Sequence, residues 1–386
     1  MTRRSGQIKA RGPGRWLVSV YVGRDGSGKR TDKTRTVRGT KREAERVLRE
    51  MLRRKDAGEP LEPTRITVGE YLDRWLEAAA GPRVRPRTFE GYRYLLARHV
   101  RPRLGRERLA AVTPLRLQEF YGALREAGCS ADAIRKTHGV LRAAFRQAVR
   151  WRLLPASPTA DVEVPKWRRR QMRALAPEEA ERFRQAAAAH PEGLLFLFLL
   201  ATGMRPEEAL GLRWQDVDLE GARVRVVQVV ERIPRPKGEA GPRWTFAEPK
   251  TAGSRRTVPL PRTLARLLAE HRRRQAAGRL RRGPYWQDHD LVFPGQLGQP
   301  LDWHNVSQRA FHAIRRAAGL AEGLRPYDLR HTTATLLLAA GESPKVVAER
   351  LGHSTTTLTL DTYAHVLPTM QERATERLEA MLFGKS

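Results

Sequence analysis

The chain opens with alternating apolar and polar positions and then changes to a helical period. The segment RWLVSVYVG at residues 15–23 alternates as a half-buried strand does, and TRTV at 34–37 resumes the pattern after the turn-rich DGSGKRTD. A helical pattern follows at about residues 40–55. We therefore predict a small sheet with one helix over residues 1–60, with a basic and partly disordered arm as the alternative.

Four amphipathic helices are predicted over residues 65–160. The first begins at a capping box, Thr67-Val-Gly-Glu70, and Thr113-Pro114 and Ser130 are start signals for the third and fourth. The apolar stripes at helical spacing are Val68, Tyr71, Leu72, Trp75 and Leu76; Tyr92, Leu95, Leu96 and His99; Leu117, Phe120, Tyr121 and Leu124; and Ile134, Leu141, Phe145 and Val149. These stripes predict the core of a four-helix domain.

A proline-rich and basic stretch separates this predicted domain from the rest of the chain. It contains Pro155, Pro158 and Pro165 and the run Lys166-Trp-Arg-Arg-Arg170, which together indicate an interdomain linker able to pass over a duplex backbone. From about residue 173 onward the pattern is helical. It is interrupted by an insert of strand-like runs at 223–231, 243–248 and 254–260.

The predicted fold class is multidomain and mostly α. We predict a small β-sheet plus helix domain at 1–60, a four-helix domain at 65–160, and a mixed α domain with a three-stranded β-sheet at 173–386. No repeat at a solenoid period is present in the sequence, which argues against the array architectures.

The charge of the chain points to a polyanion as its partner. Lysine and arginine number 73 against 42 aspartate and glutamate, for a formal net charge of +31. This surplus is more than solubility requires, so DNA or RNA is the natural candidate; a surface that is merely well solvated is the alternative.

The cysteine count and the apolar runs predict a cytosolic protein that works on DNA. Cys129 is the only cysteine, so no disulfide can form within one chain, and a reducing compartment fits. The apolar run Leu194 to Leu200 is too short for a membrane span of about 20 residues. The basic start MTRRSGQIKARGPGRW has no apolar core behind it, so no signal peptide is predicted.

Arg205 stands where a helix is predicted to begin. Pro206, Glu207 and Glu208 follow it, and a proline and carboxylates are the favoured composition of a first helical turn. An arginine at this place can grip a phosphate with its two-pronged guanidinium and with free backbone N–H groups. A surface salt bridge to a neighbouring glutamate is the alternative.

Lys250 lies in a predicted turn, Glu248-Pro-Lys-Thr-Ala-Gly-Ser254, between two strand-like runs. A hairpin there could bring its ammonium group to the leaving 5′-oxygen of a phosphodiester. Taken alone, a loop lysine is more often just solvated. Arg255 and Arg256, which follow, are interpreted as contacts with the nucleic-acid backbone and not as catalysts.

Tyr327 and Arg330 lie three residues apart at the start of a predicted helix, so their side chains point to one face. His331 is turned away by about 100°. We therefore predict that Arg330 pairs with Tyr327 and not with His331. A phenol can donate a hydrogen bond to a phosphoryl oxygen, although it carries no positive charge. A packed Tyr327 whose hydroxyl is capped is the alternative.

His353 and Tyr363 complete the set of candidate groups. Ser343-Pro344 starts a predicted helix that ends at Gly352, so His353 comes just past a glycine stop, where it can donate to a phosphoryl oxygen while its neutral form stays available. Tyr363 follows ten residues later. A free phenol has a pKa of about 10, so surrounding cations are needed to make it a nucleophile. Singly, each is an ordinary structural residue.

The motifs around these residues, taken in order, resemble those of the tyrosine recombinase (phage integrase) family. They are ATGMRPEEALGLRW, EPKTAGSRRTVPL, PYDLRHTTATLL, LGHS and LDTYAHV. The resemblance covers nearly the whole chain, and its specific motifs lie between residues 201 and 366. It implies that Arg205, Arg330 and His353 hold the phosphoryl group, that Lys250 is the general acid, and that Tyr363 is the nucleophile.

Two further residues take a meaning from the resemblance. Glu208 has the spacing of the family's structural carboxylate, which orients the site and does not react. Most relatives carry histidine where this chain has Tyr327, and we include Tyr327 among the catalytic candidates. Either its hydroxyl supplies a sufficient hydrogen bond, or the activity is weaker.

The resemblance implies a site-specific DNA recombinase that integrates or excises a mobile element. Tyr363 would attack a phosphodiester to give a 3′-phosphotyrosyl link and a free 5′-hydroxyl, and the reverse step on a partner duplex would exchange strands. No cofactor and no metal are implied. The expected partners are double-stranded DNA attachment sites, a homotetramer on that DNA, and accessory DNA-bending or excision factors. The arm-type and core-binding domains of the family would correspond to 1–60 and 65–160.

Two rival functions stay open at this point. One is a DNA-binding regulator that keeps the recombinase fold without chemistry, for which Tyr327 is the only hint. The other is a type IB topoisomerase, which shares the chemistry but relaxes supercoils as a monomer. The arm-like start and the spacing from LGHS to Tyr363 favour the recombinase. A helix-like tail, QERATERLEAML, is suited to dock on a neighbouring subunit.

Overall fold

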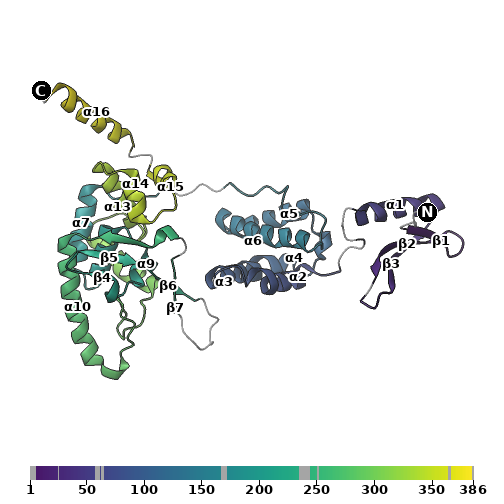
Figure 1. The fold of residues 1–386 in the computed structure, drawn as a ribbon, viewed down its shortest axis with the longest axis horizontal. Helices are drawn as coiled ribbons and strands as arrows, with labels where there is room; N and C mark the ends of the chain where they lie inside the picture. Colours follow the sequence, from purple (N-terminus) through teal and green to yellow (C-terminus); the bar gives the residue numbers. More distant parts are fainter. Residues whose placement is uncertain are drawn as a thin grey trace. The chain divides into compact units, whose positions relative to one another are not determined.

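The chain divides into two compact units, Met1–Arg169 and Arg170–Ser386 (Figure 1). The computed structural model describes residues 6–24, 26–56, 61, 65–166, 172–233, 244–249, 252–363 and 367–384, without the side chains of 252, 358 and 361–374. Among these described residues, no helix is both long and apolar enough to cross a membrane.

The chain begins with an antiparallel sheet covered by one helix. The strands β1 (Gly6–Ala10), β2 (Arg15–Arg24) and β3 (Arg30–Arg38) pair in that order, and α1 (Lys41–Asp56) follows. Val18 and Val20 of β2 point to one face of the sheet, where they form a buried core with Ala44 and Met51 of α1. The predicted small sheet with one helix is confirmed.

A helical bundle makes up the rest of the first unit. Its helices are α2 (Val68–Trp75), which runs into a π-helical turn at Leu76–Ala80; α3 (Pro86–Leu95), which continues through a π-helical turn at Leu96–Val100 into α4 (Arg101–Leu104); α5 (Pro114–Glu126); and α6 (Ala131–Arg150). Their buried residues form one hydrophobic core. This arrangement confirms the four predicted helical segments.

The predicted start signals of these helices are present as hydrogen bonds. Thr67 Oγ1 accepts from the backbone N–H of Glu70 at 3.2 Å, and Glu70 Oε2 accepts from the N–H of Thr67 at 2.8 Å, which is a complete capping box. Thr113 and Ser130 each accept a hydrogen bond from the first turn of α5 and α6. Local sequence chemistry therefore sets where these helices begin.

The second unit is mostly helical around two small sheets. Its helices are α7 (Pro177–Ala188), α8 (Gly193–Thr202), α9 (Pro206–Leu210), α10 (Arg262–Arg282), α11 (Trp303–Val306), α12 (His312–Ala317), α13 (Asp328–Ala339), α14 (Pro344–Leu351), α15 (Thr356–Tyr363) and α16 (Leu367–Phe383). Its strands are β4 (Val217–Asp218), β5 (Arg223–Val226), β6 (Val229–Arg232), β7 (Trp244–Ala247) and β8 (Arg256–Pro259).

The strands of the second unit pair differently from the prediction. A three-stranded sheet is present, but its order is β4-β5-β8, while β6 and β7 form a separate two-stranded ribbon. The predicted single strand at 223–231 is therefore wrong, because it is divided into β5 and β6, which belong to different sheets. Alternation alone gives no sign of such a change of partner within one apolar run.

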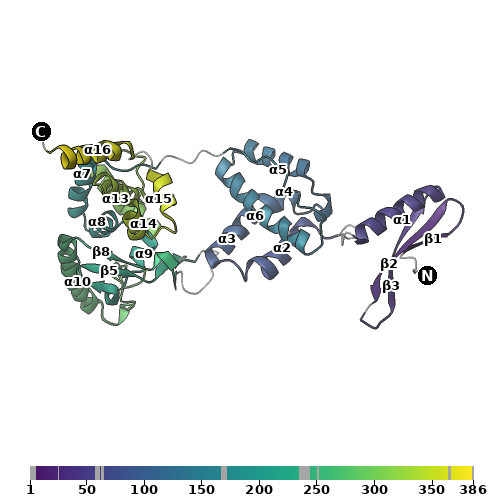
Figure 2. The same cartoon turned by 45° about the horizontal axis from the view of Figure 1, so that its top comes forward.

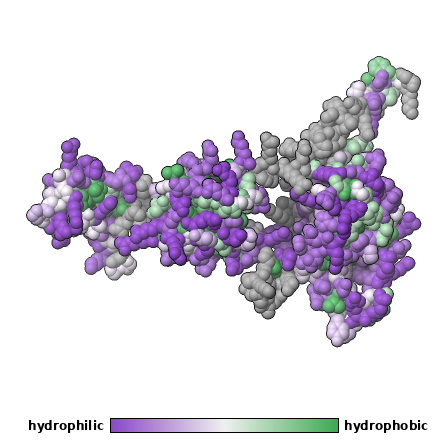
Figure 3. Space-filling model, turned by 180° about the vertical axis from the view of Figure 1, so that it is seen from behind, coloured by the Kyte–Doolittle hydropathy of each residue, from purple (hydrophilic) through white to green (hydrophobic). Residues whose placement is uncertain are grey.

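Helix α8 places the residues that follow it at the centre of the second unit. Its sequence GLLFLFLLAT is apolar on all sides, and its residues are buried or partly buried, as expected for a helix inside a core. Figure 2 shows α8, α13 and α14 side by side, with α10 along β5 and β8. The face drawn in Figure 3 is mostly hydrophilic, in keeping with the high content of charged residues. The end of α8 meets α14 next to the candidate site.

Candidate active site

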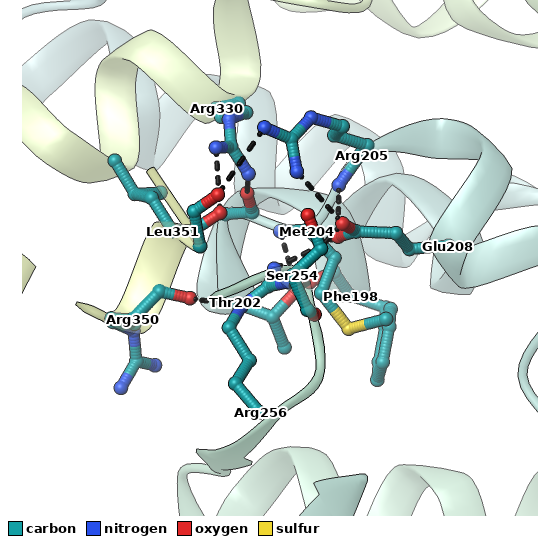
Figure 4. A network of polar contacts seen from close by, with 12 residues as sticks. Phe198, Thr202, Met204, Arg205, Glu208, Ser254, Arg256, Arg330, Arg350 and Leu351 are labelled. Atoms are coloured by element: carbon teal, nitrogen blue, oxygen red, sulfur yellow. Dashed lines mark hydrogen bonds and ion pairs between the residues drawn. The ribbon is translucent and has the colours of Figure 1, made fainter. Parts of the chain in front are cut away.

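Arg205 and Glu208 form the first part of the site, at the start of α9 (Figure 4). The Arg205 N–H donates to Glu208 Oε2 at 3.0 Å, and Arg205 Nη1 donates to Glu208 Oε1 at 2.9 Å. The side chain of Glu208 is 1% exposed and that of Arg205 is 31% exposed. The expected alternative, a salt bridge to a glutamate, is thus present, but its carboxylate is buried. The Glu208 carboxylate holds the partly exposed guanidinium of Arg205 in place. It also accepts from the backbone N–H of Arg205, which we expected to be free for a phosphate.

Three consecutive backbone carbonyls at the end of α14 each accept a hydrogen bond from a different arginine (Figure 4). The pairs are Arg256 Nε to Arg350 O at 2.6 Å, Arg330 Nη2 to Leu351 O at 2.7 Å, and Arg205 Nη2 to Gly352 O at 3.4 Å. The last carbonyls of a helix lack partners within it, and their partial negative charge attracts cations. The end of α14 therefore gathers arginines from three separate segments beside His353.

Gly352 makes this helix end possible. It ends α14 in the left-handed conformation with φ 67°, as the glycine stop predicted. A Cβ at this position would lie 2.8 Å from Arg256 Nη1 and 3.2 Å from the carbonyl oxygen of Gly253. Both the backbone conformation and the close approach of the arginine therefore favour glycine here.

Arg330 is buried at the centre of the cluster, with 2% of its surface exposed. Its Nη1 donates to the carbonyl of Gly203 at 2.7 Å, and its Nη2 donates to that of Leu351. Burial, followed by the charge of Arg205, lowers the pKa of Arg330 to about 10, so it stays positively charged near pH 7. The two carbonyls accept from Nη1 and Nη2 and fix the direction of the guanidinium, which carries further N–H donors.

His353 follows directly after the helix end and is half-buried. Its Nδ1 lies 2.7 Å from Thr359 Oγ1 in α15. Burial, followed by the charges of Arg330 and Arg205, lowers the pKa of His353 to about 4. The imidazole is therefore neutral near pH 7, when one ring nitrogen is a donor and the other an acceptor. The neutral form that the sequence favoured is thus the one present near pH 7, and the donor role of His353 stays a prediction.

Tyr327 is 43% exposed at the start of α13. Its ring packs edge-on against the ring of His331, with 5.3 Å between centroids and 61° between planes. Tyr327 also lies close enough to Arg330 to raise the pKa of that arginine, against the larger effect of burial. Tyr327 therefore has two neighbours on this helix, the predicted Arg330 and also His331. The sequence reasoning missed His331, because residues four apart on a helix also share a face.

Arg256 is part of the cluster, so its interpretation as a nucleic-acid backbone contact is wrong. Its side chain is 7% exposed and donates to both carboxylate oxygens of Glu208, at 3.1 and 2.8 Å. The neighbouring Arg255 is 55% exposed and pairs with Glu248. The alternation of β8 was the available signal, because Arg256 is two residues from the buried Val258 and shares its face.

The charges of the cluster balance in favour of a bound anion. Burial raises the pKa of Glu208, but the hydrogen bond and charge of Arg256, with those of Arg205, outweigh it and lower that pKa overall. One ionised carboxylate therefore faces Arg205, Arg256 and Arg330. Among the described residues, no group of three or more His, Cys, Asp or Glu residues is arranged to hold a metal. The surplus of fixed cations suits a phosphodiester.

The structure does not describe the side chains of two predicted site residues, Lys250 and Tyr363. Lys250 lies outside the described residues, between the end of β7 and the start of β8. Tyr363 is the last residue of α15, and its side chain is not among those described. The hydrogen bond between Thr359 and His353 connects α15 to the cluster. The roles of Lys250 and Tyr363 stay predictions.

Sequence comparisons match this chain to a known family and to curated relatives. The model of the phage integrase family matches residues 173–370, and the model of the phage integrase N-terminal SAM-like domain matches residues 67–125. The chain is 31% identical over 368 residues to an integrase of Streptomyces ambofaciens, covering 93% of this chain and 92% of that protein. It is 29% identical over 400 residues to a tyrosine recombinase XerC-like protein of Caldanaerobacter subterraneus, covering 98% and 99%.

Solved structures show the same fold. The Tn1549 transposon integrase, in complex with a circular intermediate DNA, matches with a TM-score of 0.66 and 22% identity, covering 81% of this chain and 99% of that chain. A lambda integrase tetramer bound to a Holliday junction matches with a TM-score of 0.56 and 19% identity, covering 93% and 94%. With the family match over its C-terminal half, the chain belongs to the phage integrase family, the tyrosine site-specific recombinases.

Proposed function

We propose that this recombinase cleaves and rejoins DNA at the end of α14, with Tyr363 as the nucleophile. The observation that carries the proposal is the convergence of Arg205, Arg330 and His353 on this helix end, from three separate segments. Cleavage forms a bond between Tyr363 Oη and phosphorus and breaks the bond from phosphorus to the 5′-oxygen. A 3′-phosphotyrosyl link and a free 5′-hydroxyl result, and the reverse step on a partner strand rejoins the DNA.

The arginines stabilise the charge that develops on the phosphoryl oxygens. Arg205 and Arg330 are held in place before the DNA binds, by Glu208 and by backbone carbonyls, so little reorganisation is needed at the transition state. A fixed donor of this kind contributes about 100- to 1000-fold to a rate. His353 adds a neutral donor, because its imidazole is uncharged near pH 7.

Lys250 and Tyr327 complete the proposed chemistry. Lys250 protonates the leaving 5′-oxygen. The proton is needed because an unprotonated alkoxide is a poor leaving group. The hydroxyl of the exposed Tyr327 donates a hydrogen bond to a phosphoryl oxygen beside Arg330. The phenol proton of Tyr363 is released to water as the phosphotyrosyl bond forms.

The remaining regions supply DNA contacts in this proposal. Residues 1–60 act as an arm-binding domain, 65–160 as a core-binding domain, and 173–386 as the catalytic domain. The protein integrates or excises a mobile element and works as a homotetramer on two attachment sites, with accessory DNA-bending or excision factors as further partners. The net charge of +31 and the single Cys129 support work on DNA in the cytoplasm, at the nucleoid.

A nicked suicide substrate tests the proposal. Sequencing the DNA on both sides of the gene supplies the candidate attachment site, which is then built with a nick so that cleavage traps the covalent complex. We expect wild type to give a slow band on a denaturing gel, with and without a chelator. Tyr363→Phe should bind the same DNA and give no such band.

Other outcomes of this test, together with a supercoil relaxation assay with and without paired sites, separate the rivals. Binding without a covalent band in wild type would indicate a regulator that lacks chemistry. Cleavage that is lost with chelator and restored by magnesium would indicate a nuclease mechanism. Relaxation of supercoils by a monomer without paired sites would indicate a topoisomerase.

A further inference from the structure

Arg256 makes four hydrogen bonds that connect three segments of the catalytic unit. Its Nη1 and Nη2 reach Glu208 in α9, its Nε reaches the carbonyl of Arg350 at the end of α14, and its Nη1 also reaches the carbonyl of Ser254 ahead of β8. The side chain is almost fully buried, so these contacts differ from exposed ion pairs, which contribute little to stability. A guanidinium suits this position, because its planar fork offers donors in several fixed directions.

The Glu208 carboxylate is shared evenly between two arginines. Its Oε1 accepts from Arg205 Nη1 and Arg256 Nη1, and its Oε2 accepts from the Arg205 N–H and Arg256 Nη2. These four bonds use the acceptor capacity of an ionised carboxylate. Arg256 therefore sets the position of Glu208, and Glu208 sets the position of the exposed guanidinium of Arg205.

The same arginine holds the end of α14. Its bond to the carbonyl of Arg350 is the first of the three arginine–carbonyl bonds there, and the next two seat Arg330 and Arg205. Arg350 adds its own ties, because its Nη2 donates to the carbonyls of Ala201 and Pro259. A shift of this helix end would move Arg330, Arg205 and His353 together.

We propose that Arg256 is a positioning residue, which sets Arg205 through Glu208 and sets Arg330 and His353 through the end of α14. Arg256 does not touch the DNA in this proposal. It acts through the geometry of the groups that hold the scissile phosphate. The inference rests on the proposed catalytic roles of Arg205 and Arg330.

The test uses the full chain and the variant Arg256→Lys. Lysine keeps the positive charge near Glu208 but loses the planar fork that serves a carboxylate and two carbonyls at once. Arg223→Lys is the matched control, because Arg223 pairs with Asp218 on the exposed side of β5, the strand that pairs with β8. Single-turnover cleavage is measured on suicide substrates with three forms of the scissile group.

The three substrates separate two kinds of defect. The first is the normal phosphodiester. The second carries a methylphosphonate, which is neutral and places less demand on the cations. The third carries sulfur in place of the bridging 5′-oxygen, and a thiolate leaves without a proton donor because a thiol is far more acidic than an alcohol; the cysteine thiol, for example, has a pKa of about 8.5. Within each protein, the ratio of two rates does not depend on how much of the sample is folded.

We expect Arg256→Lys to slow cleavage of the normal substrate by about 10- to 100-fold, a loss below that of a direct transition-state donor. The ratio of the methylphosphonate rate to the phosphodiester rate should rise about 10-fold over wild type and Arg223→Lys, and the ratio for the sulfur substrate should stay unchanged. The proposal would be overturned if neither ratio changed in Arg256→Lys, or if only the ratio for the sulfur substrate rose.

Arg205→Lys separates failure of this inference from failure of the proposed function. It should raise the methylphosphonate ratio, because Arg205 is proposed to contact the phosphate directly. If wild type does not cleave, or if Arg205→Lys leaves that ratio unchanged, the proposed roles of the catalytic arginines fail. If Arg205→Lys behaves as expected and Arg256→Lys does not, only the positioning role of Arg256 fails.

Discussion

The arginines of the catalytic cluster and those on the helices of residues 67–150 carry the same charge under opposite conditions. Arg256 and Arg330 are buried and bonded to backbone carbonyls or to a buried carboxylate. Arg93 and Arg101 on the helical bundle are 52% and 34% exposed and pair with Glu90 and Asp73, which are 26% and 59% exposed. An exposed pair contributes about 0–1 kcal/mol to stability, whereas removing one partner of a buried pair costs about 3–5 kcal/mol.

This difference shows what charge alone can and cannot do. Exposed arginines add to the positive potential that attracts DNA, and each can be exchanged for another without loss of geometry. The buried arginines have fixed directions, because backbone carbonyls or a buried carboxylate accept hydrogen bonds from them. In the proposed function, shape and charge together make the end of α14 a phosphate site out of residues that are ordinary elsewhere.

Among the variants that compare buried with exposed side chains, the largest expected effect is from Arg330→Lys. Lysine cannot bond the carbonyls of Gly203 and Leu351 and still present a fork to a phosphate, so cleavage should fall about 1000-fold. Arg93→Lys on the exposed surface is the counterpart, and its cleavage should stay within about 3-fold of wild type. Covalent-complex formation on the suicide substrate measures both. Similar losses in the two variants would remove the distinction between buried and exposed arginines.

The next effect is from Tyr327→Phe. If the hydroxyl donates to the scissile phosphate, its removal should lower cleavage by about 10- to 1000-fold with little change in DNA binding. Tyr327→His should retain or raise the activity, because imidazole also offers a donor. Cleavage rates and binding isotherms of the three proteins decide the matter. A Tyr327→Phe protein that cleaves like wild type would assign Tyr327 to packing against His331.

Gly352→Ala should have a smaller effect on cleavage, about 10-fold. Its Cβ would crowd Arg256 Nη1 at 2.8 Å, and the left-handed backbone adds a cost of about 1 kcal/mol or more. Gly319→Ala is the matched control, because Gly319 has φ 64° but no atom within 4 Å of the added carbon. Both variants should lose stability in thermal unfolding, and only Gly352→Ala should lose cleavage. Equal cleavage in both would show that this helix end tolerates displacement.

The smallest expected effect concerns pH. The pKa of His353 is lowered to about 4, and that of an unfolded histidine is about 6.5, so the unfolded state binds more protons between these values. Stability therefore falls as pH drops through that window. In His353→Gln this contribution is absent, so its melting temperature should drop less between pH 7 and pH 5 than that of wild type. An equal drop would mean that His353 is not held neutral.

The sequence predicted where several helices begin or end, because the signals are local. The capping box of Thr67 and Glu70 and the glycine stop at Gly352 depend on residues a few positions apart. The split of 223–231 into β5 and β6 was missed, because strand partners are chosen by distant segments.

The candidate site shows the same limit. Motif order indicated Arg205, Arg330 and His353, and the structure brings these three together. The motifs could not indicate that the carbonyls of Gly203 and Leu351 fix Arg330, since Gly203 lies 127 residues away in the chain. Arg256 was misread for the same reason, because its partner Glu208 is 48 residues distant.

The most direct test of the central claim is to identify the residue that becomes joined to DNA. The trapped complex from the suicide substrate is digested with protease and nuclease, and the linked peptide is sequenced by mass spectrometry. The account predicts a phosphotyrosine at Tyr363, joined to the 3′ side of the break, with a 5′-hydroxyl on the released strand. A link at another residue, such as Tyr327, or a link to the 5′ side, would contradict it.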